Sequence, residues 1–269
     1  MTGPKRILLP VQTDDGLESR LNVAIALAGR FGGSVQCLHA RTPPGAGRAI
    51  SASGMARLDA EEERAGQRLR HQVGSRLTDA EIEWTWHDRP GNVVAALIDE
   101  APLADLIVVS PMTEHGGPAS AEPIAEPLLL RSPTPLLIVP TDIGTFDAAG
   151  TAMVAWNGSA HAALAMRQAL PLLRAAAAVH IVTAANDIRH FPPDQAADYL
   201  KDHGIESDVL ITGDSGADAA DALGREAERR SADYIVMGGY SRSRLNELIF
   251  GGVTRHMLRH PPVPIFIRH

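Results

Sequence analysis

The sequence of 269 residues contains one cysteine, Cys37, and aromatic residues make up only 4% of it, whereas hydrophobic residues make up 45%. A single thiol excludes a disulfide within the chain and a zinc site built from cysteines. With so little aromatic surface, a core must come mainly from Ala, Leu, Ile and Val, which suits packed α/β layers. We expect a reducing, cytoplasmic setting.

The chain also lacks an excess of basic residues and lacks long apolar runs. Its net charge of −7 argues against a general nucleic-acid or membrane-surface binder, because such binding depends on clustered Lys and Arg. The apolar run after Arg6 covers about five residues, far fewer than the ~20 that span a bilayer. We therefore predict no nucleic-acid partner and no membrane partner.

What the sequence does contain is a repeat of one half in the other. Three pairs of segments recur in the same order and with similar spacing, beginning at Leu8 and Met153, at Ala104 and Ala232, and at Pro133 and Pro262. Between Thr141 and Gly150, the residues Gly, Asp and Thr interrupt the apolar pattern. We predict two domains of the same design, residues 1–145 and 146–269.

Each half alternates apolar strands with amphipathic helices. The strands are expected near 6–11, 34–39, 82–86, 106–110 and 136–139, and near 152–156, 179–183, 207–211, 234–238 and 264–267. In the first half, helices should begin near Leu17, Met55, Pro90 and Pro123. Several strands are continuously apolar, which is typical of strands covered on both faces. The predicted fold class is α/β, with two tandem doubly wound, mostly parallel five-stranded sheets.

One strand ends in glycines. The apolar run Tyr234 to Met237 is followed by Gly238 and Gly239 and then by apolar residues at helical spacing. A strand that ends in Gly-Gly before a helix offers uncovered backbone N–H groups, and a helix start favours an anion such as phosphate. Alternatively, the glycines only permit close packing of strand and helix.

These motifs resemble the universal stress protein family along both halves. Its nucleotide-binding members carry Gly, two residues, Gly, nine residues, Gly, and then Ser or Thr after the fourth strand. Gly238 and Gly251 match the first and third glycines, and Arg242 with Ser243 match the Arg-Ser that commonly follows the second. Ser241 stands in place of the second glycine. The resemblance implies the adenine nucleotide alpha-hydrolase-like fold.

Two further positions depart from the family pattern. Gly252 replaces the final hydroxyl residue, and Asn157 replaces an Asp that follows the first strand and contacts the nucleotide. The resemblance implies ATP, ADP or AMP as ligand, with Mg²⁺ as the metal that would accompany a triphosphate. The implied binding residues are Asn157, Gly238, Gly239, Ser241, Arg242, Ser243, Gly251 and Gly252.

The first half departs further from the family pattern. Its fourth strand ends in "SPMT" from Ser110, where Pro111 removes an N–H that would face a phosphate. Gly116 and Gly117 follow at the wrong spacing, and Gln12 takes the position of the first-strand Asp. We predict that this half keeps the fold and has lost the nucleotide site.

Other candidate sites have simpler interpretations. His256 and His260 have a zinc-compatible spacing but no further ligand motif, so we predict no metal residues. Ser159 is better placed to cap a helix than to act as a nucleophile, and Cys37 lies within an apolar strand. Trp84 and Trp86 alternate along a strand and share one of its faces. No catalytic residues are predicted.

Three functions remain open. The first is a stress-response module whose second half binds an adenine nucleotide and acts through conformation or partner contacts. The second is a scaffold that binds no nucleotide and acts through protein contacts alone. The third, a slow ATPase, is less favoured because no general base stands beside the glycine turn, so we expect no enzyme.

Pairing of the two halves follows from the resemblance. In the family, the last strand commonly pairs across a dimer interface, so 136–139 and 264–267 should lie together within this chain. An unpaired apolar edge would invite aggregation, which gives the pairing a physical reason. A homodimer of the whole chain is a further expected partner state.

Overall fold

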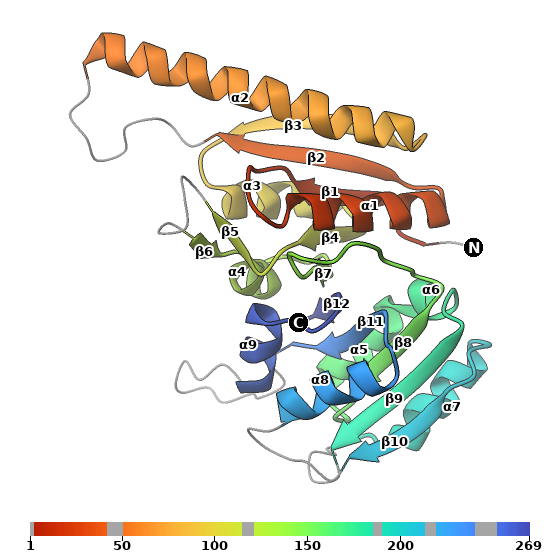
Figure 1. Ribbon diagram of the computed structural model, residues 1–269. Coiled ribbons are helices and arrows are strands. Elements are labelled where there is room, and N and C mark those ends of the chain that lie inside the picture. Colours follow the sequence, from red (N-terminus) through yellow and green to blue (C-terminus); the bar gives the residue numbers. More distant parts are fainter. Residues whose placement is uncertain (1–2, 42–50, 115–120, 185–189, 213–218, 240–251) are drawn as a thin grey trace.

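The structure is a computed structural model that describes residues 3–41, 51–114, 121–184, 190–212, 219–239 and 252–269 (Figure 1). The first half contains β1 (Arg6–Pro10), α1 (Leu17–Phe31), β2 (Ser34–Arg41), α2 (Ala52–Asp79), β3 (Glu83–Pro90), α3 (Val93–Glu100), the 3₁₀ turn η1 (Ala101–Leu103), β4 (Leu106–Val109), the small hairpin of β5 (Met112–Glu114) and β6 (Ala121–Pro123), α4 (Ala125–Arg131) and β7 (Leu136–Ile138). Apart from the hairpin, this is the predicted alternation.

The second half repeats the alternation. It contains β8 (Thr151–Ala155), α5 (Ala160–Gln168), α6 (Leu170–Leu173), β9 (Ala178–Ala184), α7 (Pro193–Asp202), β10 (Asp208–Thr212), α8 (Ala219–Arg229), β11 (Tyr234–Gly238), α9 (Gly252–Arg259) and β12 (Ile265–Arg268). Within the described ranges, no helix combines the length and the apolar character needed to cross a membrane.

The two halves share one sheet. Its order is β10-β9-β8-β11-β12-β7-β4-β1-β2-β3, and every neighbouring pair is parallel except β7 and β12. This antiparallel pair aligns Leu136 with Ile267, Leu137 with Phe266, and Ile138 with Ile265. The prediction that the last strands of the two halves lie together is confirmed. Their pairing leaves β3 and β10 as the edges of the described sheet.

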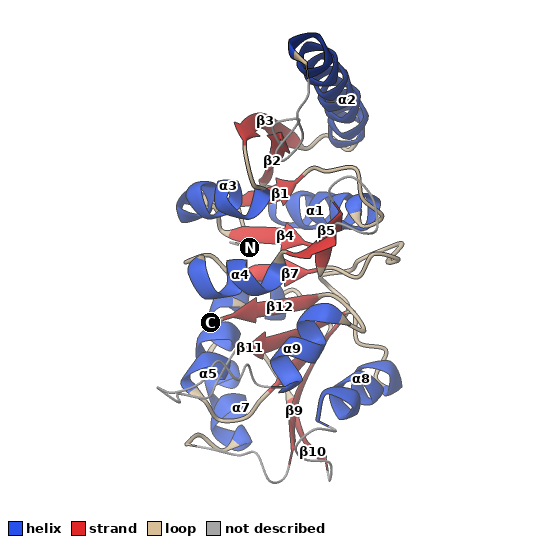
Figure 2. Cartoon of the chain, turned by 90° about the vertical axis from the view of Figure 1, so that its left-hand side faces the viewer, coloured by secondary structure: helices blue, strands red, loops and turns tan. Residues whose placement is uncertain are grey.

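Helices cover both faces of this sheet (Figure 2). One buried layer contains side chains of α1, α2, α5, α6 and α7, and the other contains side chains of α3, α4, α8 and α9. At the junction of the halves, Leu137 and Phe266 point into the first layer, whereas Leu136 and Ile267 point into the second. The halves therefore share both cores, as continuously apolar parallel strands predict.

Helix starts differ from the prediction by a few residues. α3 begins at Val93 and not near Pro90, because Pro90 still belongs to β3 and Gly91 turns the chain with a φ of 102°. Asn92 then caps the helix, its Oδ1 accepting hydrogen bonds from Val94 N (2.9 Å) and Ala95 N (3.2 Å). Pro90 interrupts the apolar pattern of the sequence, but the capping residue Asn92 sets the actual start of α3.

Candidate functional site

Strand order reverses at one point in each half, between β8 and β11 and between β1 and β4. Doubly wound sheets bind ligands outside the carboxyl ends of their strands at such switch points. The second-half switch point comprises residues 156–162, which connect β8 to the first turn of α5, together with Gly238 and Gly239 at the end of β11. The predicted residues Asn157, Gly238 and Gly239 therefore belong to the same edge of the sheet.

Gly238 lies against the start of α5. A Cβ atom on Gly238 would stand 2.5 Å from the backbone N of Ala162 and 2.5 Å from the carbonyl carbon of His161. No side chain fits at such distances from backbone atoms, so the glycine is required for the strand to approach the helix. The packing interpretation of this glycine is therefore correct, and it does not exclude a ligand beyond the strand.

Gly239 is held within the sheet. Its backbone N–H donates to Arg268 O (2.8 Å), and a Cβ atom here would lie 2.8 Å from Cδ2 of Leu129 in the first half. The N–H of Gly239 is thus not a free donor for phosphate. The same geometry corrects the reason given for Pro111, its counterpart in the repeat, because a proline at this position removes a sheet hydrogen bond and not a phosphate donor.

Asn157 belongs to the turn that leads into α5. Its Oδ1 accepts a hydrogen bond from Ser159 N (3.2 Å), and Ser159 Oγ accepts one from Ala162 N (3.2 Å). The prediction that Ser159 caps this helix is confirmed. The Asn157 oxygen that would face a ligand in the family pattern therefore also has a local structural role.

The remaining predicted residues can be located only in part. Ser241, Arg242, Ser243 and Gly251 lie outside the described residues. Gly252 is the first residue of α9, and no described atom lies within 4 Å of the position that its Cβ would take. A hydroxyl-bearing side chain would therefore fit at position 252 without a clash with any described residue.

Three cationic or titratable residues at this edge were missed by sequence reasoning. The rings of His161 and His269 stack with centroids 4.8 Å apart and planes 10° apart, and His269 Nδ1 lies 3.2 Å from Gly239 O. Burial lowers the pKa of His161, and the nearby positive charges of His269 and Arg268 lower it further. A helix start and a strand end that are distant in the sequence bring these rings together, so no local pattern predicted the pair.

Arg268 is the third of these residues. Its Nη1 donates to Ser132 O (3.2 Å), while its Nε is buried without a hydrogen-bond partner among the described residues. Burial lowers the pKa of this guanidinium. No carboxylate in the described part of the chain pairs with it. The arrangement suits an anion, because a buried N–H of a cation is costly until an acceptor reaches it.

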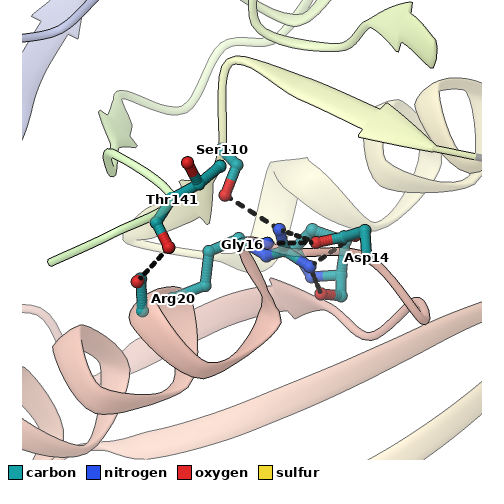
Figure 3. Close-up of polar contacts among 7 residues, drawn as sticks. Asp14, Gly16, Arg20, Ser110 and Thr141 are labelled. Carbon is teal, nitrogen blue, oxygen red and sulfur yellow. Dashed lines mark hydrogen bonds and ion pairs between the residues drawn. The ribbon is translucent and has the colours of Figure 1, made fainter. Parts of the chain in front are cut away.

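The first-half switch point is occupied by protein side chains (Figure 3). Arg20 donates through Nη1 to Asp14 Oδ1 (2.8 Å) and to Ser110 Oγ (2.8 Å), and through Nη2 to Asp14 Oδ2 (2.9 Å). The side chains of Arg20 and Asp14 are 0% and 3% exposed. Gln12, the residue at the family's Asp position, donates through Nε2 to Ala40 O (3.2 Å) and is also buried.

The structure also locates the other candidates of the sequence. His256 and His260 contact each other with ring centroids 5.5 Å apart, and no group of three or more potential metal ligands occurs among the described residues. Trp84 and Trp86 are partly buried and pack against the core. Cys37 is fully buried, and burial raises the pKa of its thiol to about 12.

Comparisons with known proteins place both halves in one family. The profile described as the universal stress protein family matches residues 3–140 and again 150–269. No curated protein matches the chain. A universal stress protein from Archaeoglobus fulgidus DSM 4304 is similar in structure, with a TM-score of 0.77, 18% identity and coverage of 98% of this chain and 97% of that chain.

Two other solved structures complete the comparison. A protein of unknown function from Pseudomonas aeruginosa PAO1 has a TM-score of 0.61 and 16% identity, with 98% of this chain and 92% of that chain covered. A universal stress protein in complex with cAMP has a TM-score of 0.38 and 19% identity, and covers 52% of this chain and 100% of its own. At that TM-score, the likeness says nothing about a ligand of the present chain.

Proposed function

Because the chain belongs to the universal stress protein family, with one match in each half, we propose that its second half binds an adenine nucleotide, ATP, ADP or AMP. The binding site is the second-half switch point, and occupancy acts through conformation or partner contacts. The chain catalyses no reaction in this proposal and works in the cytoplasm. Light scattering tests the further expectation of a homodimer.

The observation that supports the proposal is the guanidinium of Arg268 beside the Gly-Gly end of β11. Its buried Nε has no partner in the described part of the chain, and the backbone of the same residue is fixed by Gly239. A phosphate group would supply the missing acceptor, and a charge-assisted hydrogen bond of this kind contributes about 1.5 to 3 kcal/mol. Any Mg²⁺ would arrive with the triphosphate, because the described residues offer no carboxylate cluster for it.

Two measurements test this proposal. The protein is denatured and its supernatant examined by mass spectrometry for retained nucleotide, and the folded chain is titrated with ATP, ADP and AMP by calorimetry. We expect one site per chain with weak affinity and little preference among the three nucleotides, since Gly252 lacks the hydroxyl of the family pattern. Two equivalent sites per chain would contradict the proposal.

A matched pair of variants assigns the site. Arg268→Met should weaken nucleotide binding roughly tenfold to a hundredfold, the equivalent of one charge-assisted hydrogen bond. Arg259→Met removes an exposed arginine from α9 and serves as the control that should leave binding unchanged. Equal nucleotide affinities of the two variants would show that Arg268 is not part of the binding site.

The second candidate function is a scaffold that binds no nucleotide. It is favoured by the packing roles of Gly238 and Gly239, which account for both glycines without a ligand. If the wild-type chain shows no heat of binding with millimolar nucleotide, the glycine turn is a packing device and the scaffold function replaces the first.

A further inference from the structure

A pair of buried opposite charges, Arg20 and Asp14, lies where β1 and β4 end in the first half. Arg20 extends from the first turn of α1 and contacts Ser110 after β4, while its Nη2 approaches Pro10 O at 3.5 Å. The guanidinium thus joins both strand ends across the switch point (Figure 3). Burying two charges is costly unless the geometry is good and further hydrogen bonds satisfy them. Ser110 Oγ and the Gly16 N–H supply such bonds, whereas Arg20 Nε is buried without a partner among the described residues.

Asp14 accepts the hydrogen bonds that a bound anion would accept. Its Oδ1 receives Gly16 N (2.9 Å) and Arg20 Nη1 (2.8 Å), and its Oδ2 receives Arg20 Nη2 (2.9 Å). Gly16 is also the N-cap of α1, and it offers no side chain for capping. A carboxylate held by a two-pronged guanidinium and a backbone N–H at a helix start is the arrangement of an anion site.

The second half is built differently at the corresponding positions. Asn157 precedes α5 by three residues, as Asp14 precedes α1, and each forms a turn by accepting an N–H two residues on. The fourth residue of α5 is Ala163, where α1 has Arg20. Counted from the helix starts, the second half thus has a neutral amide and an alanine in place of the ion pair, whereas counted along the strand Asn157 is the counterpart of Gln12. Gly238 takes the place of Ser110.

We propose that Asp14 is an internal ligand of the first half. Its carboxylate occupies an anion site formed by Arg20 and the Gly16 N–H, so that no external anion binds there. The occupied site fixes α1, and α1 in turn holds the segment that connects the halves, because Ser19 Oγ donates to Thr141 O (2.7 Å) or Ile143 O (3.0 Å). This contact of Thr141 is visible beside the ion pair in Figure 3.

Chemical rescue tests the proposal. Asp14→Ala leaves a carboxylate-sized space beside Arg20, and formate should enter it. We expect the unfolding temperature of Asp14→Ala to lie at least about 5 °C below wild type. It should rise as formate replaces chloride at constant ionic strength, since a ligand of the folded state stabilises it. Wild type should not respond to formate in this way.

The matched control is Arg20→Met/Asp14→Ala, in which the cation is absent and formate should have no effect beyond that seen in wild type. A folded Asp14→Ala that responds to formate no more than this double variant overturns the proposal. If Asp14→Ala does not fold, recovery of a folded chain in the double variant supports the proposal, and an equally unfolded double variant overturns it. All variants carry the same second half, so the result is independent of nucleotide binding there.

Discussion

The two switch points share one backbone design and differ in their chemistry. In the first half, Arg20 and Asp14 neutralise each other between the strand ends. In the second, Gly238 brings the strand against the backbone of α5, and Arg268 lies at the same edge without a carboxylate partner among the described residues. The same repeated fold thus closes this edge with its own ion pair in one half, and in the other half it leaves an arginine there without a carboxylate partner among the described residues.

Removing one charge of the first-half pair is expected to have the largest effect. Arg20→Ala should lower the free energy of unfolding by about 3 to 5 kcal/mol, because it leaves the buried Asp14 carboxylate without its partner. Arg76→Ala breaks a pair with Glu18 in which both side chains are about half exposed and should cost ~1 kcal/mol or less. Urea unfolding measures both, and similar losses would show that burial does not set the strength of the first pair.

Blocking the close contact between β11 and α5 should have the next largest effect on stability. Gly238→Val places a Cβ atom 2.5 Å from backbone atoms of α5, and overpacking of this kind costs about 1 to 3 kcal/mol or more. Gly224→Ala is the control, since nothing lies within 4 Å of its added methyl in the described structure. An unchanged unfolding midpoint for Gly238→Val would mean that the strand does not need this close contact.

Restoring the hydroxyl of the family pattern tests nucleotide binding at the second-half switch point. Gly252→Ser meets no described atom within 4 Å of its added Cβ and should tighten ATP binding by roughly tenfold to a hundredfold through one added hydrogen bond to phosphate. AMP, which lacks the terminal phosphate, should gain less. Calorimetric titration with both nucleotides makes the test, and equal gains for ATP and AMP would place the hydroxyl away from the terminal phosphate.

The N-caps of the first helices differ between the halves, and substitutions there should change stability by a smaller amount. Ser159→Ala removes the acceptor for Ala162 N and should cost ~1 kcal/mol. α1 has no such cap, and a Cβ atom on its N-cap Gly16 would lie 2.2 Å from Ser110 Oγ. Gly16→Ser should therefore destabilise the chain although serine is a good capping residue. A stabilising Gly16→Ser would show that Ser110 moves aside easily.

The smallest expected effect concerns pH. The pKa of His161 is lowered from its ordinary value of 6.5, by burial first and then by the charges of His269 and Arg268. A histidine with a lowered pKa stabilises the fold at high pH, and that contribution is lost as pH falls below 6.5. His161→Phe should flatten this loss, whereas His71→Phe, at an exposed position of α2, should not. Equal pH profiles for both variants would contradict this account.

The repeat predicted the fold well because it is carried by short apolar strands. The pairing of Leu136 to Ile138 with Ile265 to Ile267 was implied by the family resemblance, and the cost of an unpaired apolar edge gave it a physical reason. The capping role of Ser159 followed from its place before an apolar helix. Such features depend on local pattern and on burial, which the sequence displays directly.

The candidate site was harder to predict because its contacts join distant residues. Arg20 meets Ser110 ninety positions away, and no sequence motif contains Arg20 or links the two residues. The N–H of Gly239 was expected to face a ligand. In the structure it donates a hydrogen bond to Arg268 O of β12 within the sheet. Ser241, Arg242, Ser243 and Gly251 lie outside the described residues, so their predicted roles stay predictions.

The antiparallel pairing of β7 with β12 makes the second half depend on the first for part of its surface. Because β7 and β12 run in opposite directions, the edge that carries Gly239 borders the first half, where Leu129 contacts it and Ser132 accepts the bond from Arg268. A gene split between the halves would yield a second domain with an exposed strand at Ile265 to Ile267 and an incomplete wall beside its switch point.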